Sequence, residues 1–226
     1  MQEIIKKQGY SAGVGDEGGF APNLKEDSEA IEMILAAVEM AGYKCPDDFM
    51  ISLDVAASEW VQGDSYVMPK RNVKFSTGEL IKNWVNLCAR YPIFSIEDPL
   101  GENDWNGWQK LTGDLEAVGI YGIIGDDLFV TNSERLKKGI KMKAGNGILI
   151  KPNQIGTVTE TVDAIRFARA NGFKTIVSHR SGETEDTFIA DLAVGMNTGF
   201  IKTGATCRGE RVAKFNRLLR IEEMLD

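Results

Sequence analysis

The sequence predicts an α/β fold of the TIM-barrel class over residues 1–226, with parallel strands joined by helices in one domain. Apolar segments of strand length alternate with segments of helical periodicity. Polar residues suited to chemistry stand at the carboxyl end of each predicted strand, as in barrel enzymes. The glycine-rich turn GxxxxGKS of nucleotide-binding open sheets is absent, and no GxGxxG turn follows any of the predicted strands. These three observations favour a barrel over an open sheet.

Six segments are predicted to be buried strands because they are short, apolar and rich in β-branched residues. They are MISLDV (50–55), PIFSIED (92–98), YGIIGDD (121–127), GILIKPN (147–153), KTIVSHR (174–180) and TGFIKTG (198–204). The helical segments between most of them imply right-handed crossovers and therefore parallel strands.

Four of the intervening helices have clear signals. Residues 27–41 carry apolar side chains at helical spacing, with Asp27 or Ser28 as the expected N-cap. Two further helices are expected to open with capping boxes, formed by Ser76 with Glu79 and by Thr157 with Glu160. The last is marked by an apolar stripe of Ile189, Leu192, Ala193 and Met196.

Composition excludes several classes of protein. Lys and Arg total 26 against 33 Asp and Glu, the net charge is −7, and no basic cluster is present, so a nucleic-acid partner is not expected. No apolar run reaches the roughly 20 residues of a membrane helix, and the first residues lack the apolar core of a signal peptide. The three cysteines, Cys45, Cys88 and Cys207, form no CxxC pair and suit a reducing compartment. We therefore expect a cytoplasmic protein with no membrane partner.

Three carboxylates end consecutive predicted strands. Asp54, Glu97 and Asp126 stand at equivalent positions, and the carboxyl ends of parallel strands meet at one rim. A single acid at such a position is more often a cap or a salt-bridge partner. Three together repel one another unless a hard cation lies between them, and an oxygen-only ligand set favours Mg²⁺ or Mn²⁺ over zinc.

Cationic and hydroxyl groups end the remaining strands. Lys151, Lys202 and the segment SHRS, with His179, Arg180 and Ser181, are expected on the same rim. Each residue alone has an ordinary structural explanation, but the combination is suited to holding phosphate or carboxylate oxygens. The predicted substrate is a small, multiply charged anion.

The motifs of the chain, in their order, resemble those of the enolase family. They are GVGDEGGFAPNL, SLDVAASE, SIEDPL, GDDLFVTN, LIKPNQIGT, SHRSGETEDTFIADLAVG, IKTGA and RVAKFNRLLRIEE. The resemblance covers nearly the whole chain. It implies an enolase-type TIM barrel and the reversible, Mg²⁺-dependent dehydration of 2-phosphoglycerate to phosphoenolpyruvate in glycolysis and gluconeogenesis. It also implies a homodimer or larger assembly.

The resemblance also implies roles for the rim residues. Enolase-superfamily sites are described as using a Lys or His base with one or two Mg²⁺ ions. By motif, Lys151 resembles the base that removes the C2 proton, and Glu17 resembles the acid that helps the C3 hydroxyl leave. The metal ligands would be Asp54, Glu97 and Asp126, for one of the family's two Mg²⁺ ions. The substrate contacts would be His179, Arg180, Ser181 and Lys202.

Two local features bear on this geometry. Gly13, Gly15, Gly18 and Gly19 are expected to give the Glu17 loop backbone conformations denied to other residues. Pro152 follows Lys151, where a larger apolar residue is expected in the family. It should hold Lys151 extended while removing one backbone donor.

The chain departs from the family in extent. It opens on IIKKQG, which resembles the end of a barrel helix, and the family's N-terminal α+β domain is not represented. Six strands plus the GDEGG segment predict a barrel that does not close, with exposed strand edges. Two hypotheses stay open: a portion of a true enolase that is active when the rest is supplied, or a noncatalytic binding or structural protein. Another dehydratase of the superfamily fits these motifs less well.

Overall fold

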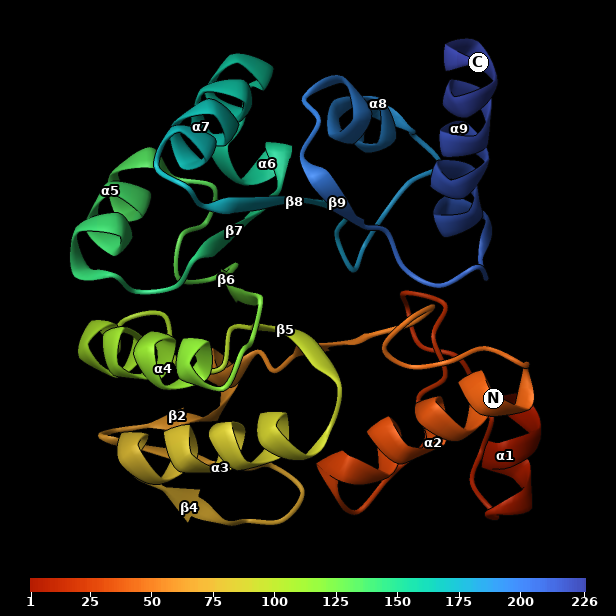
Figure 1. Ribbon diagram of the computed structural model, residues 1–226, viewed down its shortest axis with the longest axis vertical. Helices are drawn as coiled ribbons and strands as arrows, with labels where there is room; N and C mark the ends of the chain where they lie inside the picture. The colour runs from red at the N-terminus through yellow and green to blue at the C-terminus, as the bar shows by residue number, and fades with distance from the viewer.

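A curled sheet of six parallel strands forms the centre of the molecule in the computed structural model, which describes all 226 residues (Figure 1). Strands that follow one another in the sheet also follow one another along the chain. They are β1 (Ile51–Asp54), β5 (Ile93–Glu97), β6 (Gly122–Gly125), β7 (Gly147–Ile150), β8 (Lys174–Ser178) and β9 (Gly199–Lys202). All six predicted strands and their parallel arrangement are confirmed. The predicted burial is wrong for β1 and β9, which are partly exposed because they form the edges of the sheet.

Helices lie around the outside of this sheet, and both termini lie on the same side of the view in Figure 1. Those that follow the strands β1 and β5 to β8 are α3 (Thr77–Arg90), α4 (Trp105–Ala117), α5 (Ser133–Met142), α7 (Val158–Ala170) and α8 (Phe188–Gly195). The others are α1 (Gln2–Lys7), α2 (Asp27–Met40), the short α6 (Pro152–Ile155), α9 (Gly209–Leu225) and the 3-10 helix η1 (Ala57–Trp60). The structure thus has the half-barrel form of an α/β barrel.

Helix starts agree with the sequence at two of three places. Ser76 and Glu79 form the complete reciprocal capping box at α3. Thr157 accepts the backbone N–H of Glu160 at α7, as expected. The expected N-cap of α2 is wrong: the helix begins at Asp27, and Glu26 precedes it without a side-chain cap. The Asp27 carboxylate instead forms an ion pair with Arg71, so a distant partner takes the group that would have capped the helix.

The core lies between the outer face of the sheet and the helices. Ile96, Ile148 and Val177 point outward from their strands and are fully buried, against helix residues such as Leu80 and Trp108. The indole N–H of Trp108 donates to the carbonyl of Gly101 at 3.1 Å, so the largest buried side chain leaves no polar group unpaired. This packing holds the strands at the positions from which the site residues project.

The sheet does not close on itself. β1 and β9 are its two edges and do not pair with each other, which agrees with the predicted incomplete barrel. The GVGDEGG segment adds no strand; it is a tight loop closed by a single bridge between Val14 and Phe20. None of the helices is long and apolar enough to cross a lipid bilayer.

A second, antiparallel sheet follows η1. It consists of β2 (Val61–Gln62), β3 (Ser65–Val67) and β4 (Lys74–Phe75). The sequence analysis did not predict it, because strands of two or three residues are too short to show periodicity.

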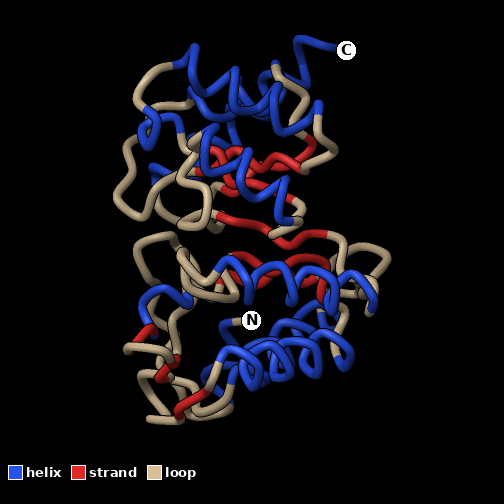
Figure 2. The backbone as a smooth tube through the Cα atoms, turned by 90° about the vertical axis from the view of Figure 1, so that its left-hand side faces the viewer, coloured by secondary structure: helices blue, strands red, loops and turns tan.

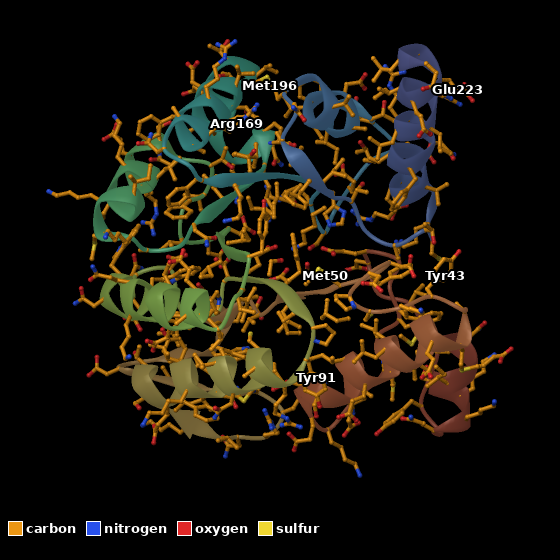
Figure 3. The ribbon with its side chains drawn as sticks, in the orientation of Figure 1. Tyr43, Met50, Tyr91, Arg169, Met196 and Glu223 are labelled. Carbon is orange, nitrogen blue, oxygen red and sulfur yellow. The ribbon has the colours of Figure 1, made fainter.

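Turned by 90°, the molecule shows its strands between flanking helices, with long loops along one side (Figure 2). Contacts between neighbouring helix units hold the outer layer together. Arg169 of α7, for example, donates to the carbonyl of Met196 just after α8 at 2.6 Å, and the two residues lie together in Figure 3.

Candidate active site at the carboxyl ends of the strands

The predicted site residues gather at one rim of the sheet. Asp54, Glu97 and Lys202 are the last residues of β1, β5 and β9. Asp126, Lys151 and His179 each directly follow a strand or lie within one residue of its end. Because the strands are parallel and in sequential order, all these side chains face one end of the sheet.

Lys202 links the two edges of this rim. Its ammonium group donates to Asp54 Oδ2 at 2.6 Å and to Glu97 Oε1 at 2.9 Å. Burial alone would lower the pKa of Lys202, but the carboxylates of Glu97 and Asp54 outweigh it and raise that pKa. Lys202, at the end of the edge strand β9, is therefore held as a cation between two acids at the ends of β1 and β5, which lie at the opposite edge of the sheet.

Glu97 is the most strongly perturbed of the three predicted metal ligands. Burial raises its pKa to about 7; Lys202 opposes this rise, and the negative charges of Asp54 and Asp126 add to it. Glu97 is thus close enough to Asp54 and to Asp126 to be repelled by each, which is the electrostatic condition that a divalent cation relieves. The three predicted ligands do not, however, lie within 4.8 Å of one another as a group.

Lys151 forms an ion pair with Asp126. Its backbone is extended, with φ −118° and ψ 104°, as expected before proline. Pro152 is the first residue of α6, a position whose N–H has no partner within a helix. The backbone N–H that proline lacks would therefore have had no partner, so its absence costs no hydrogen bond. Pro152 starts the short helix α6 directly after Lys151.

Two residues that the sequence analysis did not single out support Asp126 and Lys151. Gln154 donates to Asp126 Oδ1 at 3.0 Å and accepts from the buried hydroxyl of Thr131 at 2.8 Å. The same hydroxyl accepts the backbone N–H of Lys151 at 2.9 Å. Val130 and Thr131 both have positive φ, 44° and 55°. Such strain in β-branched residues is typical of functional sites. Gln154 lies in the motif LIKPNQIGT, but nothing in the spacing of that motif predicted its contact with Asp126.

Glu17 reaches the rim from the loop before α2. Ser181 Oγ donates to Glu17 Oε1 at 3.2 Å, and His179 Nε2 lies 3.3 Å from Glu17 Oε2. Ala205, just after β9, donates its backbone N–H to the carbonyl of Glu17 at 2.9 Å. The structure thus brings Glu17, His179 and Ser181 together, as the motifs implied.

The glycines of this loop act differently from the prediction. Only Gly18 has positive φ, 80°, whereas the expectation for Gly13, Gly15 and Gly19 is wrong, because these three have ordinary backbone angles. A Cβ at Gly18 would lie 2.4 Å from the carbonyl oxygen of Cys207, so the loop approaches the β9–α9 connection too closely for any side chain there.

Arg180 is exposed at the outer edge of the rim. Its guanidinium donates to Asn153 Oδ1 at 3.0 Å, on α6. The residue after β8 is thereby brought next to the segment that carries Lys151. A cation at this place is accessible to an anionic ligand entering from solvent.

A second group of carboxylates lies beside the predicted ligands. Oxygen atoms of Asp98, Asp126 and Asp127 lie within 4.8 Å of one another. Both Asp98 oxygens already accept backbone N–H groups, from Asp126 at 3.0 Å and Asp127 at 2.8 Å. Asp98 therefore fixes the backbone directly after β6. Like Gln154 and Thr131, it is a residue to which the sequence analysis assigned no role.

The donor set at the rim fits a hard divalent cation. The candidate ligands are all carboxylates, and the pKa of Glu97 is raised first by its burial and then by the negative charges of Asp54 and Asp126, which a cation would offset. In the structure the ammonium groups of Lys202 and Lys151 supply this positive charge. The structure brings Asp126 together with Asp98 and Asp127 as a group that could hold a metal, whereas Asp54 and Glu97 are bound by Lys202.

Comparison with known protein families agrees with this geometry. The family model described as "Enolase, C-terminal TIM barrel domain" matches residues 1–226, the whole chain. The curled parallel sheet, the acidic and basic rim and the family match are consistent with one another. The chain therefore belongs to the enolase family, as its C-terminal TIM barrel domain.

Proposed function

We propose that this chain carries out the enolase reaction, the reversible dehydration of 2-phosphoglycerate to phosphoenolpyruvate. One observation carries the proposal: two groups lie on the same rim. The first is a lysine that pairs with a carboxylate, and the second is an acid that accepts from a serine hydroxyl and faces a histidine ring. Lys151 pairs with Asp126, and Glu17 accepts from Ser181 and faces His179. A reaction that takes a proton from one carbon and releases hydroxide from its neighbour needs one base and one acid.

The proposed steps balance over the residues of this chain. Lys151 first releases to solvent the proton of the ammonium group that pairs with Asp126. The neutral amine then takes the C2 proton as the C2–H bond breaks, and the electron pair forms the C2=C3 double bond. Glu17 gives its proton to the C3 hydroxyl, which leaves as water when the C3–O bond breaks. Arg180 would bind the phosphate, and Lys202 would balance charge near Asp54 and Glu97.

A divalent cation, Mg²⁺ by the nature of the ligands, would be held by Asp54, Glu97 and Asp126. When bound, it supplies positive charge at the substrate carboxylate, which spreads the negative charge that develops as the C2 proton leaves. The chain's own contribution is to place these carboxylates on one rim, at or directly after the ends of β1, β5 and β6.

The test follows phosphoenolpyruvate by its ultraviolet absorbance, from 2-phosphoglycerate with excess Mg²⁺. Because the sheet has two unpaired edges, it is run on the chain alone and on the chain mixed with the N-terminal portion of an enolase. Activity is expected in the mixture, and Lys151→Ala should lower it by at least about 100-fold, the usual cost of losing a general base.

Lys82→Ala is the matched control, since Lys82 is an exposed lysine on α3, away from the rim. It should leave the rate unchanged. Activity of the chain alone would show that six strands suffice. A protein that is folded by circular dichroism but inactive in both assays would contradict the proposal and favour the noncatalytic binding or structural role.

A further inference from the structure

Arg211, on α9, is fully buried and reaches both loops that carry the acid end of the site. One nitrogen of its guanidinium, Nη1, contacts His179 Nδ1 at 2.9 Å and donates to the carbonyl of Arg180 at 2.7 Å. The other, Nη2, donates to the carbonyls of Asp16 at 2.9 Å and Ser181 at 2.7 Å. One side chain therefore bonds to the residues on either side of the Glu17 and His179 contact.

The charge of Arg211 has no close carboxylate partner. The nearest, Glu210, lies 3.8 Å from Nε, and Nε itself has no hydrogen-bond acceptor. A buried cation without a close anion destabilises a fold unless its hydrogen bonds compensate. Its bonds to loop carbonyls and to His179 are therefore the features that account for an arginine at this position.

The contact with His179 determines where the histidine carries its proton. An arginine is protonated at every ordinary pH and has only donors. His179 Nδ1 must therefore be the acceptor, which requires a neutral ring with its single proton on Nε2. Nε2 is buried, has no hydrogen-bond partner, and lies 3.3 Å from Glu17 Oε2. The Glu17 side chain is 41% exposed, so a small movement can complete this bond.

The surroundings of His179 agree with a neutral ring. Burial is the largest influence and lowers its pKa; Glu17 raises it, Arg211 and Lys202 lower it, and Glu183 raises it.

We propose that Arg211 is a positioning residue, which holds His179 in the Nε2–H tautomer and ties the Glu17 loop to the loop after β8. Glu17 then receives two donors, one from His179 and one from Ser181, on its two oxygens. The consequence for catalysis rests on the proposed function of Glu17 as the acid. The tautomer of His179 and the contact between the two loops do not depend on that function.

His179 is the chain's one histidine, so its ring signals can be assigned without ambiguity. The protein is labelled with ¹⁵N in the histidine ring, and long-range ¹H–¹⁵N correlation spectra are recorded near neutral pH without substrate or metal. The expected spectrum shows unprotonated Nδ1 and protonated Nε2. A spectrum with the proton on Nδ1 would overturn the proposal.

Arg211→Met and Lys214→Met form the matched pair of variants. Lys214 is the other fully buried cation of α9, one turn further on, and it donates to the carbonyls of Thr184 and Glu210 without touching His179. Arg211→Met should lose the Nε2–H tautomer as the dominant form, whereas Lys214→Met should keep it. A folded Arg211→Met protein with the original tautomer would refute the inference.

If Arg211→Met does not fold, the Arg211→Lys variant tests the proposal instead. Lysine is also only a donor, so the Nε2–H tautomer should persist, and its loss would count against the proposal. In the phosphoenolpyruvate assay, Arg211→Lys should lower kcat by at least about 10-fold, because one ammonium cannot replace the planar fork. An inactive wild-type protein with the expected tautomer would refute the proposed function alone, since the tautomer is measured without substrate.

Discussion

Gly18 is the residue that fits the acidic loop against the rest of the molecule. Its φ of 80° is rare for other residues, and a Cβ would lie 2.4 Å from the backbone oxygen of Cys207. Gly18→Ala should therefore push the loop away from the β9–α9 connection. We expect a loss of about 1–3 kcal/mol in the free energy of unfolding, measured by urea denaturation, and at least about a 10-fold loss of activity in the phosphoenolpyruvate assay.

Gly19→Ala is the control for this prediction. A Cβ there has no atom within 4 Å, and its φ is ordinary. Stability and activity should stay near those of the unchanged protein. If both alanine variants behave alike, the close approach at Gly18 does not hold the loop.

The glycines of this loop show how far the conformation of a single residue can be predicted from the sequence. The cluster of glycines around Glu17 predicted a loop of unusual conformation, yet only Gly18 uses one. Which glycine is needed depends on the carbonyl of Cys207, which is nearly the whole length of the chain away. A local pattern cannot contain that information.

At the scale of elements, α8 and α9 are joined by an ion pair between Asp191 and Arg217. The guanidinium bonds both oxygens of the Asp191 carboxylate. These hydrogen bonds hold the pKa of Asp191 below its ordinary value of 3.8. A lowered pKa means that the pair contributes stability above pH 3.8 and loses it as the pH falls through the lower, folded-state pKa.

Asp191→Asn should therefore destabilise the protein at pH 7 and not at low pH. The side chain is 40% exposed, so screening limits the effect to no more than about 1 kcal/mol. Thermal unfolding of both proteins from about pH 7 to about pH 2 should show the difference shrinking below about pH 4. Asp163→Asn on α7, an exposed acid without an ion pair, is the control. A pH-independent difference would mean that Asp191 acts through its shape and not its charge.

Elements differ in how well sequence predicts them. The six strands of the barrel sheet were predictable because each is a short apolar segment; β6 and β7 are fully buried, whereas the edge strands β1 and β9 are partly exposed. The capping box at Ser76 and the N-cap at Thr157, where the reciprocal bond of the expected box does not form, were predictable because such contacts are local. The start of α2 was not, because Arg71 binds the acid that could have capped it.

For the whole molecule, the open edges of the sheet set the expected pattern of motion. β1 and β9 each pair with one strand, whereas β6 and β7 lie between two neighbours. Local opening requires fewer broken contacts at an edge. Backbone amides of residues 51–54 and 199–202 should therefore exchange with solvent at least about 10-fold faster than those of 122–125 and 147–150. Hydrogen exchange followed by mass spectrometry measures this.

Addition of the N-terminal portion of an enolase should then slow exchange at β1 and β9 and leave β6 and β7 unchanged. Equal protection in all four strands of the chain alone would show instead that the edges are covered, for example by a second copy.

By itself, the sequence determined the family, the order of strands and helices, and the residue types that line the rim. It could do so because strand burial, helix capping and motif order are properties of neighbouring residues. The tertiary structure alone decided the partners: Lys202 between Asp54 and Glu97, Gln154 on Asp126, and Arg211 on His179. These contacts join residues far apart in the chain, and their geometry exists only after the sheet has curled and the loops have met.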